Sequence, residues 1–537
     1  MMRKSIQWLA ALVSILMVFS VCAVAEESWR VVPEGETIEI TLWTEWDPGK
    51  GITMSSLNDI KTLPIIEADT GVKLNFLHPT QGAGREQLNL MLVSGDLPDI
   101  IFYDWKNFPG GPMKVIDDGS VIPLNDLVDQ FAPNYKSFIE ANPTIAAQTI
   151  TDEGVIYAFS NFCIDARDPS EPGYIPAFQT FGWLIRQDWL EACGINKLPE
   201  TIPEWEAALT AFKAMEPQGE EPVIPFVANK AGDVRNWSRA WGFPLDFYIE
   251  DVENQKVGYG YYKEEYRDAL EVLARWYADG LIDPDFAVSD GTQKDALITG
   301  NIAGSWTGST SGGFGRYITM MKPNNPDLKM TGTVPPCVEG GEPYKFDGWS
   351  KFAMGRQAVI TTSCKNPEAA AKFADYFYGP VGHMLMNYGI EGVTYEFVDG
   401  VPLFTEYVTK NPDGLSIDQV LYQYALSADD FLFLMEPQLW LNRMSLPEQR
   451  EMLPRWATGS KDRIMPPVLP TSDEAAEMSA VLGEITTYVE EMFTKFVMGV
   501  EPLSNFDTYI KSLESLGIER VLELKQAQLE RYYQRIK

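Results

Sequence analysis

Apolar and polar positions alternate over several short runs of the chain, and segments with helical spacing separate these runs. Residues 73–77 have the alternation of a strand, and the apolar side chains within residues 88–92 give the next segment one hydrophobic side. After a tight turn at residues 94–96 comes a short, almost fully apolar strand at residues 99–102. A strand, a helix and an apolar strand in this order predict a parallel sheet that is covered on both faces.

The same patterns predict further strands and helix starts. Residues 37–43 form an opening strand, residues 154–159 another, and residues 182–190 a strand that passes into a helix. A further helix is expected to begin after Thr201, whose hydroxyl can cap it, with Pro203 in the first turn. The length of 537 residues favours two or three lobes over a single core.

The second of the two parallel strands ends in Tyr103, Asp104 and Trp105. Open α/β sheets bind ligands just beyond the carboxyl ends of their strands. Aromatic rings stack on the apolar face of a sugar ring, and a carboxylate accepts hydrogen bonds from its hydroxyls. This cluster therefore indicates a sugar ligand.

Several motifs resemble one known family. They are Ser94–Ile100 (SGDLPDI), Gly154–Ser160 (GVIYAFS), Arg186–Leu190 (RQDWL), Leu198–Trp205 (LPETIPEW) and Asn387–Tyr395 (NYGIEGVTY). In this order they resemble the extracellular solute-binding proteins of carbohydrate ABC importers, the family that includes maltose-binding protein. The last motif and the tail at residues 506–533 are similar to a larger subgroup, which includes alginate- and glycosaminoglycan-oligosaccharide-binding proteins.

The resemblance implies an α/β fold of the two-lobed, type II periplasmic-binding-protein class, with a ligand cleft between lobes that crossing hinge segments join. It places residues 26–181 and 352–387 in lobe 1 and residues 182–351 in lobe 2. Residues 388–537 are expected in lobe 2 and in C-terminal helices. The implied function is that of the substrate-binding component of an ABC importer, which delivers an oligosaccharide to permease subunits and catalyses no reaction. A monomer is expected.

Two other functions stay open. Cleft aromatics and paired carboxylates also serve secreted glycoside hydrolases and lyases, although no carboxylate pair stands out in this sequence. A sugar-sensing binding protein that presents its ligand to a receptor would use the same lobes as a transport protein.

The first 25 residues have the features of a signal peptide. Arg3 and Lys4 precede an apolar stretch at residues 8–21, and Ala25 ends a small-x-small cleavage motif. We therefore expect a secreted protein outside the cytoplasmic membrane. A lipid anchor on Cys22 is the alternative, which the bulky valine before this cysteine disfavours.

Charge and composition argue against several partners and cofactors. The formal net charge of −33 disfavours nucleic acid and anionic membranes as partners. Cys163, Cys193, Cys337 and Cys364 are scattered, so buried free thiols are expected, with one or two disulfides left open. No cofactor is expected, and the glycine-rich residues 308–313 lack the Gly-Lys-Ser/Thr ending of a nucleotide-binding loop.

A metal site is not expected either. Alginate-binding relatives carry a calcium loop, rich in Asp and Asn, in the interval that Glu216–Pro225 occupies here. Such a loop needs spaced oxygen ligands over about 12 positions with a final bidentate acid. The interval is short and lacks that series.

The candidate ligand-binding residues combine the strand end with tryptophans beside Gly, Pro, Asn or Asp, since binding residues concentrate in loops. Trp105 and Trp306 match ligand-stacking positions of the family in opposite lobes, so we expect sugar rings between them. Core packing is the alternative for each tryptophan, a surface salt bridge for Arg235, and a helix cap for Glu391. No catalytic residue is expected. The candidates are Trp43, Trp46, Tyr103, Asp104, Trp105, Arg235, Trp237, Trp241, Trp306, Trp349, Glu391 and Tyr395.

Overall fold

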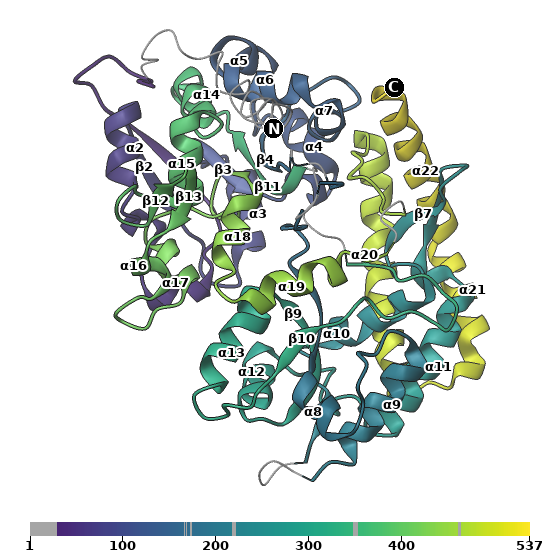
Figure 1. The fold of residues 1–537 in the computed structure, drawn as a ribbon. Helices are drawn as coiled ribbons and strands as arrows, with labels where there is room; N and C mark the ends of the chain where they lie inside the picture. The colour runs from purple at the N-terminus through teal and green to yellow at the C-terminus, as the bar shows by residue number, and fades with distance from the viewer. Residues whose placement is uncertain are drawn as a thin grey trace, which may run out of the picture.

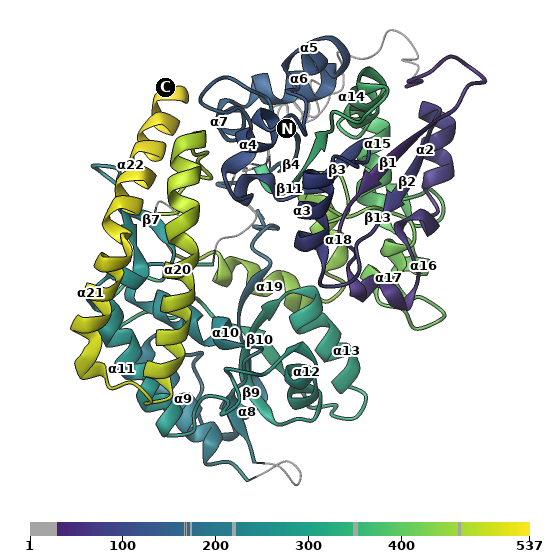
Figure 2. The ribbon, with the colours of Figure 1, turned by 180° about the vertical axis from the view of Figure 1, so that it is seen from behind.

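The computed structural model describes residues 29–537, apart from residues 166, 168, 172–173, 217–221, 347–352 and 460–462. The described residues form two lobes of mixed α/β structure (Figures 1 and 2). This arrangement confirms the predicted fold class. The expected signal peptide lies outside the described residues. Among the helices within them, none combines the length and hydropathy that crossing a bilayer requires.

Lobe 1 is built on a six-stranded sheet. In order across the sheet, its strands are β14 (Leu434–Met435), β4 (Phe159–Cys163), β11 (Ala353–Ile360), β3 (Ile100–Tyr103), β1 (Ile38–Trp43) and β2 (Val72–Leu77). β1 pairs in parallel with β2 and β3, as predicted, whereas β11 runs antiparallel to β3 and β4. In β2 the side chains of Val72, Leu74 and Phe76 are buried and alternate with more exposed ones, so one face of the strand enters the core.

Helices surround this sheet (Figure 1). The predicted helix between β2 and β3 ends at Gly95, whose φ of 73° gives the left-handed turn that favours glycine. The helices that precede β4 are α2 (Leu63–Thr70), α3 (Gly84–Ser94), α4 (Gly111–Asp117), α5 (Asn125–Phe131), α6 (Pro133–Ala141) and α7 (Pro143–Thr149). Two more helices of lobe 1 follow β11, namely α14 (Pro367–Tyr376) and α15 (Pro380–Tyr388).

Residues 388–435 differ from the expected division, because they lie in lobe 1. β14 extends the lobe 1 sheet beside β4, and Phe431 and Phe433 are buried in the core of that lobe. A strand of two residues has no periodic pattern, so no sequence signal marks this part of the sheet. The elements that precede it are β12 (Tyr395–Val398), β13 (Val401–Phe404), α16 (Glu406–Thr409) and α17 (Ile417–Tyr422).

Lobe 2 contains a four-stranded sheet and a separate two-stranded ribbon. The sheet has the order β10 (Met330–Gly332), β5 (Phe181–Arg186), β9 (Ala303–Ser309) and β6 (Ile224–Phe226), and the ribbon joins β7 (Phe247–Asp251) to β8 (Lys256–Tyr259). Its helices are α8 (Gln187–Ala192), α9 (Ile202–Lys213), α10 (Ala231–Arg235), α11 (Glu265–Ala278), α12 (Gly291–Thr299) and α13 (Arg316–Met321). The predicted start of α9 is confirmed, since Thr201 and Glu204 cap each other's backbone amides and a proline lies in the first turn.

Three segments connect the lobes: the first follows β4, the second precedes β11 and the third follows β14. The third contains α18 (Pro437–Arg443) and α19 (Pro447–Trp456). On α19 the indole of Trp456 donates to the carbonyl of Trp183 at 3.1 Å and covers Gly182. A Cβ on Gly182 would come within 2.5 Å of this ring, so only glycine fits there.

The C-terminal helices contact both lobes (Figure 2). They are α20 (Ser472–Val497), α21 (Phe506–Leu516) and α22 (Ile518–Arg535), and α20 packs against α11 of lobe 2 and α4 of lobe 1. Arg531 of α22 forms ion pairs with Asp152 of lobe 1 and Glu474 of α20. Arg535 donates to the carbonyl of Ile150 in lobe 1 at 2.7 Å. These helices therefore form a brace across the hinge.

Candidate ligand-binding site

The carboxyl ends of β1, β2 and β3 meet at one edge of the lobe 1 sheet, because the three strands are parallel. The chain leaves these strands toward Trp46, His78 and Tyr103-Asp104. The rings of Trp46 and His78 pack 5.3 Å apart, and both are only partly buried. Trp46 and Tyr103 thus keep part of their surface open at the edge where a ligand is expected.

Arg356 adds a positive charge to this edge, because the antiparallel strand β11 begins where β3 ends. Its guanidinium donates to the Glu45 carboxylate at 2.5 Å and to the main-chain carbonyl of Asp429 at 2.9 Å. One carboxylate oxygen of Asp104 is buried and has no hydrogen-bond partner, while the other accepts a bond from Asn107 at 2.8 Å. Neither Glu45 nor Arg356 was identified from the sequence.

Burial and neighbouring charges shape the chemistry of this edge. Burial raises the pKa of Tyr103 and the charge of Glu45 raises it further, so the phenol remains a hydrogen-bond donor at neutral pH. Burial, followed by the charge of Asp430, raises the pKa of Asp429. Asp430 itself forms a buried ion pair with Lys50. The edge offers a guanidinium, a phenol and carboxylates, a mixture of donors and acceptors that suits sugar hydroxyls.

The edge of lobe 2 that faces lobe 1 carries hydroxyl groups. The chain enters lobe 2 at Phe181, which pairs with Ser309, the last residue of β9, so the end of β9 faces the hinge. Thr310 and Ser311 follow, and their hydroxyl oxygens are buried and have no hydrogen-bond partner. Burial closes both oxygens to a ligand in this conformation, and the partly exposed hydroxyl residue at this end of β9 is Ser309.

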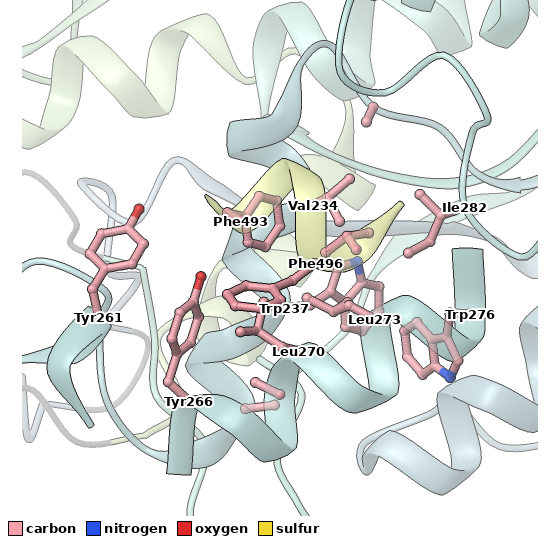
Figure 3. Packing of buried hydrophobic residues seen from close by; sticks show 14 of the residues in the cluster. Val234, Trp237, Tyr261, Tyr266, Leu270, Leu273, Trp276, Ile282, Phe493 and Phe496 are labelled. Atoms are coloured by element: carbon pink, nitrogen blue, oxygen red, sulfur yellow. The ribbon is translucent and has the colours of Figure 1, made fainter. Parts of the chain in front are cut away.

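Four of the predicted binding tryptophans lie in hydrophobic cores. Trp43 and Trp105 belong to the cluster around β3, where both rings have at most 1% of their surface exposed. Trp306 has no exposed surface, and its indole donates to the carbonyl of Gly313 at 3.1 Å. Trp237 has no exposed surface and lies in the lobe 2 core, part of which Figure 3 shows.

A ring without exposed surface has no face on which a sugar can stack in this conformation. The burial of these four rings therefore favours the alternative of core packing. A position beside glycine or at a strand end predicts a loop. It does not predict whether the ring at that position points into the core or toward the solvent. Trp241 is partly buried at the border of the lobe 2 core, and Trp349 lies outside the described residues.

The remaining candidates lie away from the strand ends that face the hinge. Arg235 donates to Glu490 at 2.8 Å and to the Tyr261 hydroxyl at 3.0 Å, which is the salt bridge considered as its alternative. Glu391 is exposed next to the β12–β13 ribbon of lobe 1. Tyr395 begins that ribbon and packs its ring 5.4 Å from the ring of Tyr388.

Neither a cluster of metal-ligating side chains nor a disulfide occurs among the described residues. Within the described ranges, no group of three or more His, Cys, Asp or Glu side chains could hold a metal ion. Residues 217–221 of the interval compared with a calcium loop lie outside these ranges, so the absence of calcium there remains a prediction. Cys163, Cys193, Cys337 and Cys364 form no disulfide with one another in the described part of the chain, and Cys163 and Cys337 are buried.

Residues 56–384 match the family model for bacterial extracellular solute-binding proteins. Over 348 residues the chain is 28% identical to the fructooligosaccharide ABC transporter substrate-binding protein FusA of Streptococcus pneumoniae. This alignment covers 62% of this chain and 60% of FusA. Over 388 residues the chain is 25% identical to the lipoprotein LipO of Bacillus subtilis, and this alignment covers 70% of this chain and 72% of LipO.

Solved structures show the same fold over nearly the whole chain. The alginate-binding protein AlgQ2 without calcium ion superposes with a TM-score of 0.75 at 24% identity, covering 94% of this chain and 100% of that chain. FusA of S. pneumoniae in complex with kestose gives a TM-score of 0.74 at 20% identity, covering 93% and 100%. The two-lobed fold is therefore shared with both.

Proposed function

The chain belongs to the family of bacterial extracellular solute-binding proteins, and we propose that it binds an oligosaccharide between its lobes and delivers it to the permease subunits of an ABC importer. The observation that carries the proposal is the pair of strand edges at the hinge, with Arg356, Glu45 and Tyr103 on lobe 1 and Ser309 at the end of β9 on lobe 2. The relative FusA is named for fructooligosaccharide and AlgQ2 for alginate, which supports a saccharide ligand.

Binding is coupled to closure of the lobes in this proposal. A ligand that contacts both edges makes more contacts in the closed state than in the open one, and this difference in affinity drives the equilibrium toward closure. Trp46 supplies a partly open aromatic ring, and Arg356 can hold two oxygens of the ligand at once. The protein catalyses no reaction and acts as a monomer outside the cytoplasm, after removal of the leader at Ala25.

Calorimetric titration against a panel of oligosaccharides, fructo-oligosaccharides and alginate oligosaccharides among them, tests the proposal. Arg356→Met and Trp46→Ala should each weaken binding about 30-fold, the equivalent of a hot spot worth ~2 kcal/mol. Arg275→Met is the matched control, because Arg275 pairs with Glu206 at 2.6 Å on α11, outside both edges. The proposal fails if no saccharide binds, or if the edge variants bind as tightly as the control.

A further inference from the structure

A buried glutamine joins the third crossing segment to the edge of lobe 2 that faces the hinge. Gln449 lies in the first turn of α19, and only 2% of its surface is exposed. Its side-chain oxygen accepts a bond from the Leu446 amide at 2.8 Å, which caps the start of the helix. Its side-chain nitrogen donates to the main-chain carbonyl of Thr310 at 2.8 Å. Because Thr310 follows β9, one side chain connects the end of this strand with the point where the third segment enters lobe 2.

The first crossing segment is held at the same residue. The Thr310 amide donates to the carbonyl of Thr180 at 2.9 Å, and Thr180 is the last residue before β5. Next to it, the side chain of Gln179 donates to the carbonyl of Phe346, in the segment that leads to β11, at 3.2 Å. Thr310 and Gln179 are both buried. Buried hydrogen bonds therefore link all three crossing segments beside the end of β9.

A single turn of π-helix, η6 (Ser311–Gly315), begins at Thr310. The Gly315 amide donates to the Thr310 carbonyl at 2.9 Å, the same oxygen to which the glutamine is bonded. Within the turn, the Gly313 amide donates to the hydroxyl of Ser309 at 3.2 Å. A hydroxyl that accepts one bond still has its own hydrogen to donate. The turn therefore sets the direction of the partly exposed Ser309 hydroxyl at the end of β9.

We propose that Gln449 is a positioning residue for ligand binding, which holds the Thr310 carbonyl and through η6 keeps the Ser309 hydroxyl directed at the saccharide. The proposal rests on the proposed function and adds to it a residue that sets affinity without touching the ligand. A hydroxyl that is already ordered in the free protein costs less loop and side-chain ordering when the ligand binds. Since Gln449 also caps α19, the edge of β9 and the third crossing segment move as one unit when the lobes rotate.

Calorimetric titration of the full chain tests the effect on affinity. The probe is the saccharide that binds wild type most tightly among the fructo-oligosaccharides and alginate oligosaccharides of the panel. Gln449→Met, which keeps the length of the side chain and removes both of its bonds, should raise Kd about 3- to 10-fold.

Thr361→Val is the matched control. Thr361 is also buried, and its hydroxyl donates to the main-chain carbonyl of Pro98 at 2.6 Å, 263 positions away in the chain. This bond lies where β11 ends and β3 begins, at the edge of lobe 1 opposite to the carboxyl end of β3. Thr361→Val should lower stability and leave Kd unchanged.

Hydrogen exchange gives a readout that needs no ligand. Amides of residues 311–315 should exchange about 3- to 10-fold faster in Gln449→Met than in wild type, and at the wild-type rate in Thr361→Val. Exchange at the wild-type rate in Gln449→Met would show that the glutamine does not fix the turn, which overturns the proposal.

A double-mutant cycle separates positioning from a general loss of structure. If Gln449 acts through Ser309, Gln449→Met should raise Kd by less than about 2-fold in a Ser309→Ala background, because the directed hydroxyl is already gone. Should Gln449→Met not fold, Gln449→Glu keeps an acceptor for the Leu446 amide, lacks the donor to Thr310 and carries the same expectation. Equal losses in both backgrounds, or wild-type affinity in the variant, would refute the positioning role and leave the proposed function standing. If wild type binds no saccharide, both proposals are overturned.

Discussion

The brace of C-terminal helices gives the sharpest test of how this fold is held together. Arg531 forms a bidentate contact with Glu474, at 2.8 Å and 2.5 Å, and also an ion pair with Asp152. The side chains of Asp152 and Glu474 are 15% and 12% exposed, and that of Arg531 is 29% exposed. Removal of one partner from a fully buried pair costs about 3–5 kcal/mol, and the exposure of Arg531 reduces this to roughly 2–3 kcal/mol for Arg531→Met.

Local hydrogen exchange is the appropriate assay, because a chain of two lobes need not unfold in one step. A loss of about 2 kcal/mol in local opening free energy should speed amide exchange about 30-fold in α22 and at residues 147–153. Arg520→Met is the control on the same helix, since Arg520 pairs with Glu477 and Glu523 with all three side chains more than 40% exposed. Its effect should be at most ~1 kcal/mol. Equal exchange in the two variants would refute the brace.

The effect of Arg531→Met should also depend on pH. Burial raises the pKa of Glu474, but the hydrogen bonds and charge of Arg531 outweigh burial, so the pKa of this carboxyl lies below its usual value. A carboxyl with a lowered pKa contributes stability that is present above the unfolded value, about 4.3, and is lost as the pH falls through the folded value. The difference in exchange between wild type and Arg531→Met should therefore be full at pH 7 and shrink below about pH 4.

Two further outcomes follow from burial. Trp105→Ala and Trp306→Ala should each lower the free energy of unfolding by about 3–5 kcal/mol, because both rings are buried in cores. Protein that stays folded should bind ligand like wild type. Thermal unfolding and calorimetric titration measure the two effects, and a large loss of affinity in folded protein would show that these rings belong to the binding site. Cys163 should stay unreactive toward a thiol reagent at pH 8 until urea is added, because the residue is buried and burial raises the pKa of its thiol. Cys364 should react slowly, because burial raises the pKa of its thiol to about 11. Rapid reaction of Cys163 in native protein would contradict its burial.

The parts of the fold with periodic patterns could be predicted from the sequence. The alternation in residues 73–77 and the apolar run at residues 99–102 correspond to β2 and β3, and the capping residues around Thr201 mark the start of α9. The return of the chain through β14 could not be predicted, because two residues carry no period and the strand is held by its neighbour β4, about 270 positions away. Long-range pairing of this kind leaves no local signal.

The candidate site shows the same limit. Tyr103 and Trp46 were found because aromatic residues after strands stand out, but Arg356 and Glu45 come together only in the folded sheet, 311 positions apart in the chain. Trp105 follows β3 and Trp306 lies within β9, yet both rings are buried in cores. Sequence position identifies a strand end, whereas the direction of a side chain at that end depends on packing against helices that lie elsewhere in the chain.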